Sequence, residues 1–115
     1  MRAYGVLVHD ICELTPDGVV VYFPSRALLR ECRAEWESKE NIYEKINQIK
    51  RIYEEEEWEA DNIKAVHDFK RRCQLGRGGV FFIAAESEFA KFQTFYGYYS
   101  KSIIFLGVPY NPFPL

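Results

Sequence analysis

The spacing of apolar residues changes along the first third of the chain and marks three elements. Tyr4, Leu7, Val8, Ile11 and Leu14 recur at helical spacing, which predicts a helix over residues 2–14. The turn residues 15–18 end it, because they include a proline, an aspartate and a glycine. The β-branched and aromatic run at 19–23 predicts a buried strand that stops before a proline.

A helix, an ambiguous segment and an acidic run follow. Ser25 is a plausible N-cap for a helix that places the apolar residues Leu28, Leu29, Cys32 and Trp36 on one face. Residues 42–53 keep helical spacing, although the last two also suit a short strand. The acidic run at 54–61 is typical of a solvated loop or helix start, with a site for a cation or basic partner as the alternative.

The second half alternates a helix with two apolar runs. Asp61 or Asn62 can cap a helix that turns Ile63, Val66, Phe69 and Cys73 inward and closes at Gly76. Residues 79–85 and 102–106 are typical of two further strands, and three prolines in the tail end the pattern. We therefore expect an α/β fold over residues 1–115, as a single domain whose sheet is mostly parallel.

Composition adds limits to this fold. The 115 residues hold 15 Lys and Arg against 17 Asp and Glu, a net charge of −2, so no overall basic field favours nucleic acid. The three cysteines have no metal-ligand spacing and are typical of reduced, buried thiols. No apolar run approaches the length of about 18 residues that spans a membrane, so we expect an intracellular protein without a membrane partner.

Several motifs, in order, resemble one helicase family. Residues 18–25, Gly-Val-Val-Val-Tyr-Phe-Pro-Ser, resemble motif IV in the second RecA-like lobe of XPD-type superfamily 2 iron–sulfur DNA helicases, the family of the TFIIH helicase subunit. The glycine-rich Gly-Arg-Gly-Gly at 76–79 and the run from Ile103 to Tyr110 fit the same lobe. The resemblance covers nearly the whole chain and implies a RecA-like lobe 2, with a short strand near 50–53 in place of the end of the helix.

The stretch that corresponds to motif V departs from the family. The family pattern is Ala-Arg-Gly-Lys-x-Ser-Glu-Gly-Ile-Asp-Phe, whereas residues 85–95 are Ala-Glu-Ser-Glu-Phe-Ala-Lys-Phe-Gln-Thr-Phe. Glu86 and Glu88 replace two cations and would repel a phosphodiester. The residues that break the pattern, which we describe as a degenerate motif V, are Glu86, Glu88, Lys91 and Thr94, together with Phe92 in place of a glycine.

The resemblance also implies parts that this sequence does not contain. In the family, ATP, Mg²⁺ and a four-iron cluster depend on a first lobe, and motif VI supplies further ATP contacts. Motif VI would lie beyond Leu115, so the lobe is truncated by this interpretation, and no Gly-x-x-x-x-Gly-Lys-Ser/Thr occurs in the chain. We expect no cofactor, catalytic residue or metal site in this chain alone, and no autonomous ATPase activity.

Two groups of residues remain candidates for binding. Ser25 and Arg26, where motif IV resembles a DNA-backbone contact, and Arg77 in a local basic cluster are candidate nucleic-acid contacts, with helix capping and solvated charge as the alternative. An aromatic cluster either docks a partner, stacks bases or packs on the sheet. Its members are Phe89, Phe92, Phe95, Tyr96, Tyr98 and Tyr99.

The leading hypothesis is a non-catalytic interaction module in a transcription or DNA-repair helicase assembly, nuclear if the organism is eukaryotic. Its partner would be an assembly subunit or a complementary lobe. Two alternatives stay open. The chain could be part of a working ATP-dependent DNA helicase whose first lobe and motif VI lie elsewhere, or an accessory module that binds single-stranded DNA weakly.

Overall fold

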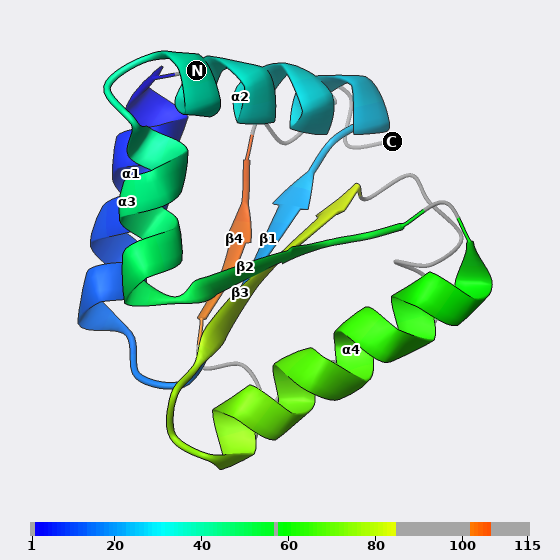
Figure 1. Ribbon diagram of the computed structural model, residues 1–115. Helices are drawn as coiled ribbons and strands as arrows, with labels where there is room; N and C mark the ends of the chain where they lie inside the picture. Colours follow the sequence, from blue (N-terminus) through cyan, green and yellow to red (C-terminus); the bar gives the residue numbers. More distant parts are fainter. Residues whose placement is uncertain (1, 57, 85–101, 107–115) are drawn as a thin grey trace, which may run out of the picture.

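The chain forms a mixture of helices and strands, which includes the short strand that the resemblance implies near residues 50–53. The computed structural model describes residues 2–56, 58–84 and 102–106 (Figure 1). The elements are α1 (Arg2–Leu14), β1 (Gly18–Phe23), α2 (Arg26–Ser38), α3 (Ile42–Ile49), β2 (Arg51–Glu54), α4 (Glu59–Gln74), β3 (Gly79–Ala84) and β4 (Ser102–Phe105).

The described strands form one parallel sheet in the order β2-β3-β1-β4. β1 pairs with β3 along its full length, from Gly18 opposite Gly79 to Phe23 opposite Ala84. A parallel sheet needs both faces covered, and its inner strands then contain continuous apolar runs. The valines at 19–21 and all of β3 are buried accordingly. The expected α/β fold with a mostly parallel sheet is confirmed.

Helices α1, α2 and α3 cover one face of the sheet, and α4 covers the other (Figure 1). On the face of α1, α2 and α3, Trp36 packs against Phe23 and Phe82, with ring centroids 6.0 and 5.9 Å apart. On the face of α4, Phe69 packs edge-on against Phe81 at 5.5 Å, and Tyr53 completes a second aromatic group. Such aromatic pairs each add about 0.5–1.5 kcal/mol beyond the area they bury.

Two local predictions are wrong at the edges of elements. α3 ends at Ile49, not at residue 53, because Lys50 turns to extended backbone and β2 then pairs with β3. The resemblance anticipated this strand, whereas local periodicity did not. The second correction concerns α4, which begins at Glu59 after Trp58, so neither Asp61 nor Asn62 caps it, and Ile63 is 63% exposed.

The cysteines match the expectation from composition. All three cysteines are free and buried. Burial raises the pKa of Cys12 to about 12 and that of Cys73 to about 11, so both thiols are protonated at neutral pH. Within the described ranges, no helix has the length and apolar content needed to cross a bilayer.

The turn between α4 and β3 contains two glycines in the left-handed region, which differ in their surroundings. Gly76 has φ +77° and open space where a Cβ would lie, whereas Gly78 has φ +71° beside the Asp17 carbonyl and the Lys50 ammonium. We expect Gly78→Ala to lower the free energy of unfolding by about 1–3 kcal/mol more than Gly76→Ala, because it adds a clash to the backbone strain. Urea denaturation of both variants measures the difference, and equal losses would contradict it.

Candidate functional site at the carboxyl edge of the sheet

The candidate site begins at the first turn of α2, where β1 ends. Ser25 is the N-cap, and its hydroxyl oxygen accepts a hydrogen bond from the Leu28 amide at 3.1 Å, as predicted for this residue. The next residue, Arg26, donates from Nη2 to Oε2 of Glu55 at 2.9 Å. The cation of the motif IV loop is therefore ion-paired within the chain.

Glu55 is the acid that joins three elements at this edge. Its side chain is 3% exposed. Oε2 meets Arg26, while Oε1 accepts from the Ala84 amide at 2.5 Å, and the Glu55 amide donates to the Phe82 carbonyl at 3.1 Å. The carboxylate thus satisfies the last amide of β3 and the first arginine of α2 together. Hydrogen bonds to charged groups contribute about 1.5–3 kcal/mol each.

Glu54 makes a second paired cluster beside the first. Its carboxylate lies 3.3 Å from Nη1 of Arg33 and accepts from the Tyr43 hydroxyl at 3.2 Å. Burial raises the pKa of Glu54, and the opposing effect of Arg33 is smaller. Burial is also the main cause that raises the pKa of Tyr43, and the negative charge of Glu54 raises it further. The expectation that the whole acidic run is solvated is wrong for Glu54 and Glu55, because β2 carries both into contact with α2.

Arg26, Arg33, Glu54 and Glu55 line a pocket of about 210 Å³ at the carboxyl edge. Three arginines of α2 face three consecutive glutamates that begin at the end of β2. Two of the arginines, Arg26 and Arg33, are ion-paired with Glu55 and Glu54. The charges of this pocket largely compensate one another, which leaves a weak local field for an anionic ligand.

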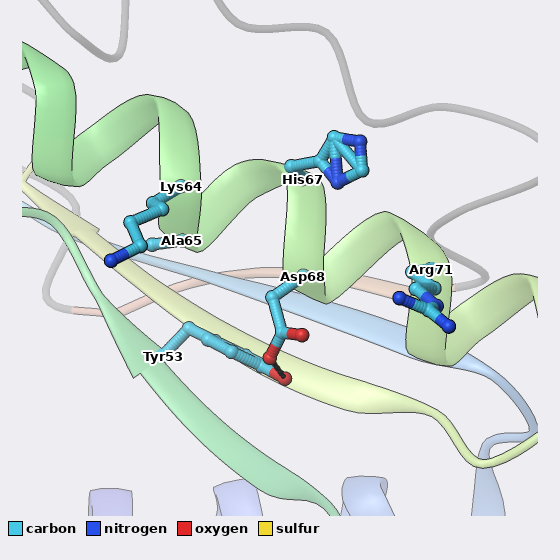
Figure 2. Close-up of a pocket in the computed structure, with 6 residues that line it drawn as sticks. All are labelled: Tyr53, Lys64, Ala65, His67, Asp68 and Arg71. Atoms are coloured by element: carbon cyan, nitrogen blue, oxygen red, sulfur yellow. Dashed lines mark hydrogen bonds between the residues drawn. The ribbon is translucent and has the colours of Figure 1, made fainter.

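A second pocket, of about 390 Å³, lies between α4 and β2 (Figure 2). Figure 2 shows Asp68 pointing from α4 toward Tyr53, and the Tyr53 hydroxyl donates to Oδ2 of Asp68 at 2.5 Å. Burial and this hydrogen bond raise the pKa of Tyr53. The guanidinium of Arg51 lies over the Tyr53 ring, 5.8 Å from its centroid. These contacts fix Tyr53 and Asp68 in place and leave His67 exposed on the outer side of α4.

The predicted site residues do not all meet at this edge. Ser25 and Arg26 lie at the carboxyl end of β1, whereas Arg77 lies before the amino end of β3, at the opposite edge of a parallel sheet. The nearby Arg72 donates from Nε to the Gly78 carbonyl at 3.1 Å, which supports the capping interpretation of this cluster. The aromatic cluster and the degenerate motif V, residues 86–99, lie outside the described residues.

Glu54 and Glu55 are the residues that sequence reasoning missed. Both belong to an acidic run, and such runs are usually solvated. The signal that could have found them was positional: a strand that ends at Glu54 in a parallel sheet brings its last acids to the edge where Arg26 begins α2. Among the described residues, no three His, Cys, Asp or Glu side chains gather as metal ligands.

In the described part of the chain, a parallel sheet lies between α1, α2 and α3 on one face and α4 on the other, which is consistent with a RecA-like lobe. The family model of the helicase C-terminal domain matches residues 8–114, and the chain belongs to that family, as an XPD-type superfamily 2 lobe.

Relatives are found among much longer helicases. The chain is 31% identical over 111 residues to the general transcription and DNA repair factor IIH helicase subunit XPD of Arabidopsis thaliana, a match that covers 96% of this chain and 14% of the relative. It is 24% identical to the ATP-dependent DNA helicase CHL1 of Meyerozyma guilliermondii, over 96% of this chain and 13% of the relative. It is also 24% identical to a regulator of telomere elongation helicase 1 homolog of Aedes aegypti, over 97% and 11%. The chain therefore spans 14% or less of the length of each of these relatives.

The half-buried position of Glu54 predicts a pH dependence of stability. Its pKa is raised above the ordinary 4.5 in the folded protein, so the folded state binds more protons than the unfolded state between these two values. Stability from this group is therefore present at pH values below 4.5 and is lost as the pH rises through the folded value. We expect the difference in unfolding free energy between the wild type and Glu54→Gln, measured by urea denaturation, to fall as the pH rises from 4.5 through the pKa of Glu54 in the folded protein. A difference that is flat or rises with pH would contradict the assignment.

Proposed function

We propose that this chain is a helicase C-terminal lobe that works by binding a protein partner and does not itself hydrolyse ATP. The observation that carries the proposal is the Arg26–Glu55 ion pair. Because the Arg26 guanidinium is bound to Glu55, it is less available to bind a phosphate group. The pair is held in place, since the other oxygen of Glu55 is bonded to the Ala84 amide. A lobe with compensated charge at this edge is suited to protein contacts.

The sequence of the degenerate motif V supports the same proposal. Glu86 and Glu88 stand where the family has cations, and Phe92 stands where it has a glycine. The described carboxyl edge also offers little to a nucleoside triphosphate, because Arg26 and Arg33 are already paired with Glu55 and Glu54. ATP, Mg²⁺ and an iron–sulfur cluster therefore have no assigned role in this chain, and we derive no catalytic step.

The relatives suggest the kind of assembly. One relative is a helicase subunit of the general transcription and DNA repair factor IIH, so an assembly subunit or a complementary helicase lobe is the proposed partner. With such a partner, the proposed location is the nucleus if the organism is a eukaryote. The aromatic cluster at 89–99 is the proposed docking surface, because aromatic side chains provide large contact areas at interfaces.

The proposal predicts a partner that depends on the aromatic cluster. We expect the tagged chain to co-purify with a stoichiometric protein from its own cells, and Phe92→Ser with Tyr98→Ser to remove at least nine-tenths of that protein. Leu14→Ser is the control, since Leu14 is 82% exposed and lies on α1. Isolation of a lone monomer at micromolar concentration, or ATP turnover by the purified chain, would overturn the proposal. Salt-dependent binding of single-stranded DNA in fluorescence anisotropy would instead favour the accessory module.

A second candidate function rests on the extent of the similarity. The match covers 96% of this chain but 14% of XPD, as expected for one part of a longer working helicase. That function predicts an in-frame phosphate-binding Gly-x-x-x-x-Gly-Lys-Ser/Thr upstream in the transcript and a motif VI downstream. Sequencing the full-length transcript checks this, and stop codons on both sides would exclude it.

A further inference from the structure

β2 is an edge strand whose outer side remains partly open. It pairs with β3 on one side, and no described strand lies on the other. Alternate backbone groups of such a strand point away from the sheet. The Glu55 amide bonds to β3, whereas the Ile52 amide points outward to Oδ1 of Asn47 at 3.0 Å. The residues with outward backbone groups are therefore Ile52, Glu54 and Glu56.

Two asparagine side chains cover the ends of this outer edge. Asn47 accepts from the Ile52 amide, and Asn62 bonds to both the amide and the carbonyl of Glu56, at 2.5 and 2.9 Å. Asn62 is 8% exposed, so its cap is fixed. Between these caps, the Ile52 carbonyl and the amide and carbonyl of Glu54 make no hydrogen bond with any described residue. An unpaired edge of this kind is a template for another strand.

A groove of about 290 Å³ runs along these open groups. Tyr43 of α3 lines one side and Ala65 of α4 lines the other, with β2 between them. Ala65 is small and half-buried, so it leaves room for an incoming backbone. The groove has charge at its two ends, because it is lined by Arg51 at the start of β2 and by Glu56 just after it. Glu56 is exposed and makes no ion pair with a described residue.

We propose that the outer edge of β2 is a strand-addition site for an extended peptide segment of a protein partner. The segment forms three backbone hydrogen bonds, two to Glu54 and one to the Ile52 carbonyl, in either strand direction. It carries a basic side chain beside Glu56 and an acidic side chain beside Arg51. This inference rests on the proposed function, because it assigns a chemical class to the partner, but it uses a surface separate from the aromatic cluster.

Synthetic peptides test the proposal on the 115-residue chain. The probes are two labelled hexapeptides with opposite charge order, Glu-Val-Thr-Val-Thr-Lys and Lys-Thr-Val-Thr-Val-Glu, and versions N-methylated at the central residues. We expect at least one hexapeptide to bind in fluorescence anisotropy with a Kd below about 1 mM and its N-methylated version to bind at least tenfold more weakly. We also expect the bound peptide to slow hydrogen exchange of the Glu54 amide at least tenfold. Binding by neither peptide, equal binding after methylation, or unchanged Glu54 exchange would overturn the proposal.

Variants of the groove provide matched controls. Ala65→Trp fills the groove and should abolish binding, whereas Ala34→Trp adds the same bulk at an exposed position of α2 that does not line it. Glu56→Gln should weaken binding about two- to fivefold, in line with an exposed ion pair. Asn47→Ala frees the Ile52 amide for a fourth hydrogen bond and should strengthen binding by about two- to tenfold. If these peptide results fail while the co-purified partner stays bound through Phe92 and Tyr98, only the strand-addition site is wrong.

Discussion

The Glu55 carboxylate holds the carboxyl edge of the sheet together, because it contacts both β3 and α2. Parallel strands end together, so their last amides and the first turns of the following helices crowd at one edge and need acceptors. Glu55 supplies one acceptor to Ala84 at the end of β3 and one to Arg26 at the start of α2. A buried carboxylate without such partners costs several kcal/mol, so the three groups are mutually dependent. Arg26 is held in place for the same reason, and this restriction underlies the proposed function.

At the amino edge of the sheet, a buried cation makes a similar contact between elements. Lys50 is 6% exposed, and its ammonium donates to the Asp17 carbonyl at 2.8 Å. It follows α3, while Asp17 lies in the turn before β1 and Gly78 lies beside both, before β3. The segments that precede β1, β2 and β3 thus meet at the Lys50 ammonium. This contact requires Lys50 to leave the helix, so α3 ends at Ile49. Local helical preference yields to this burial and to the pairing of β2 with β3.

The sequence predicts the elements better than it predicts the contacts between them. The helix at 2–14 and the strands of valines and phenylalanines follow from apolar spacing, although Leu7 and Leu14 of that helix are exposed. The short strand β2 does not, since its four residues also fit a helical period and only pairing with β3 decides. The ion pairs of Glu54 and Glu55 are harder to predict, because nothing in an acidic run identifies the partner of each acid. Arg26, the partner of Glu55, lies 29 residues away in the chain. The family resemblance predicts the strand, whereas the ion pairs depend on the three-dimensional arrangement of β2 and α2.

The two sides of β2 differ, because one side pairs with β3 and the other has no described neighbouring strand. On the side of α2, Glu54 at the end of β2 and Glu55 just after it are ion-paired with arginines of that helix. Away from β3, asparagines at 47 and 62 shorten the open edge to the groups around Glu54. Natural proteins limit open edges because long ones aggregate, and a short edge admits only a segment of a few residues with matching hydrogen bonds. In the proposed strand addition, such an edge would select a partner segment by backbone geometry first and by charge second.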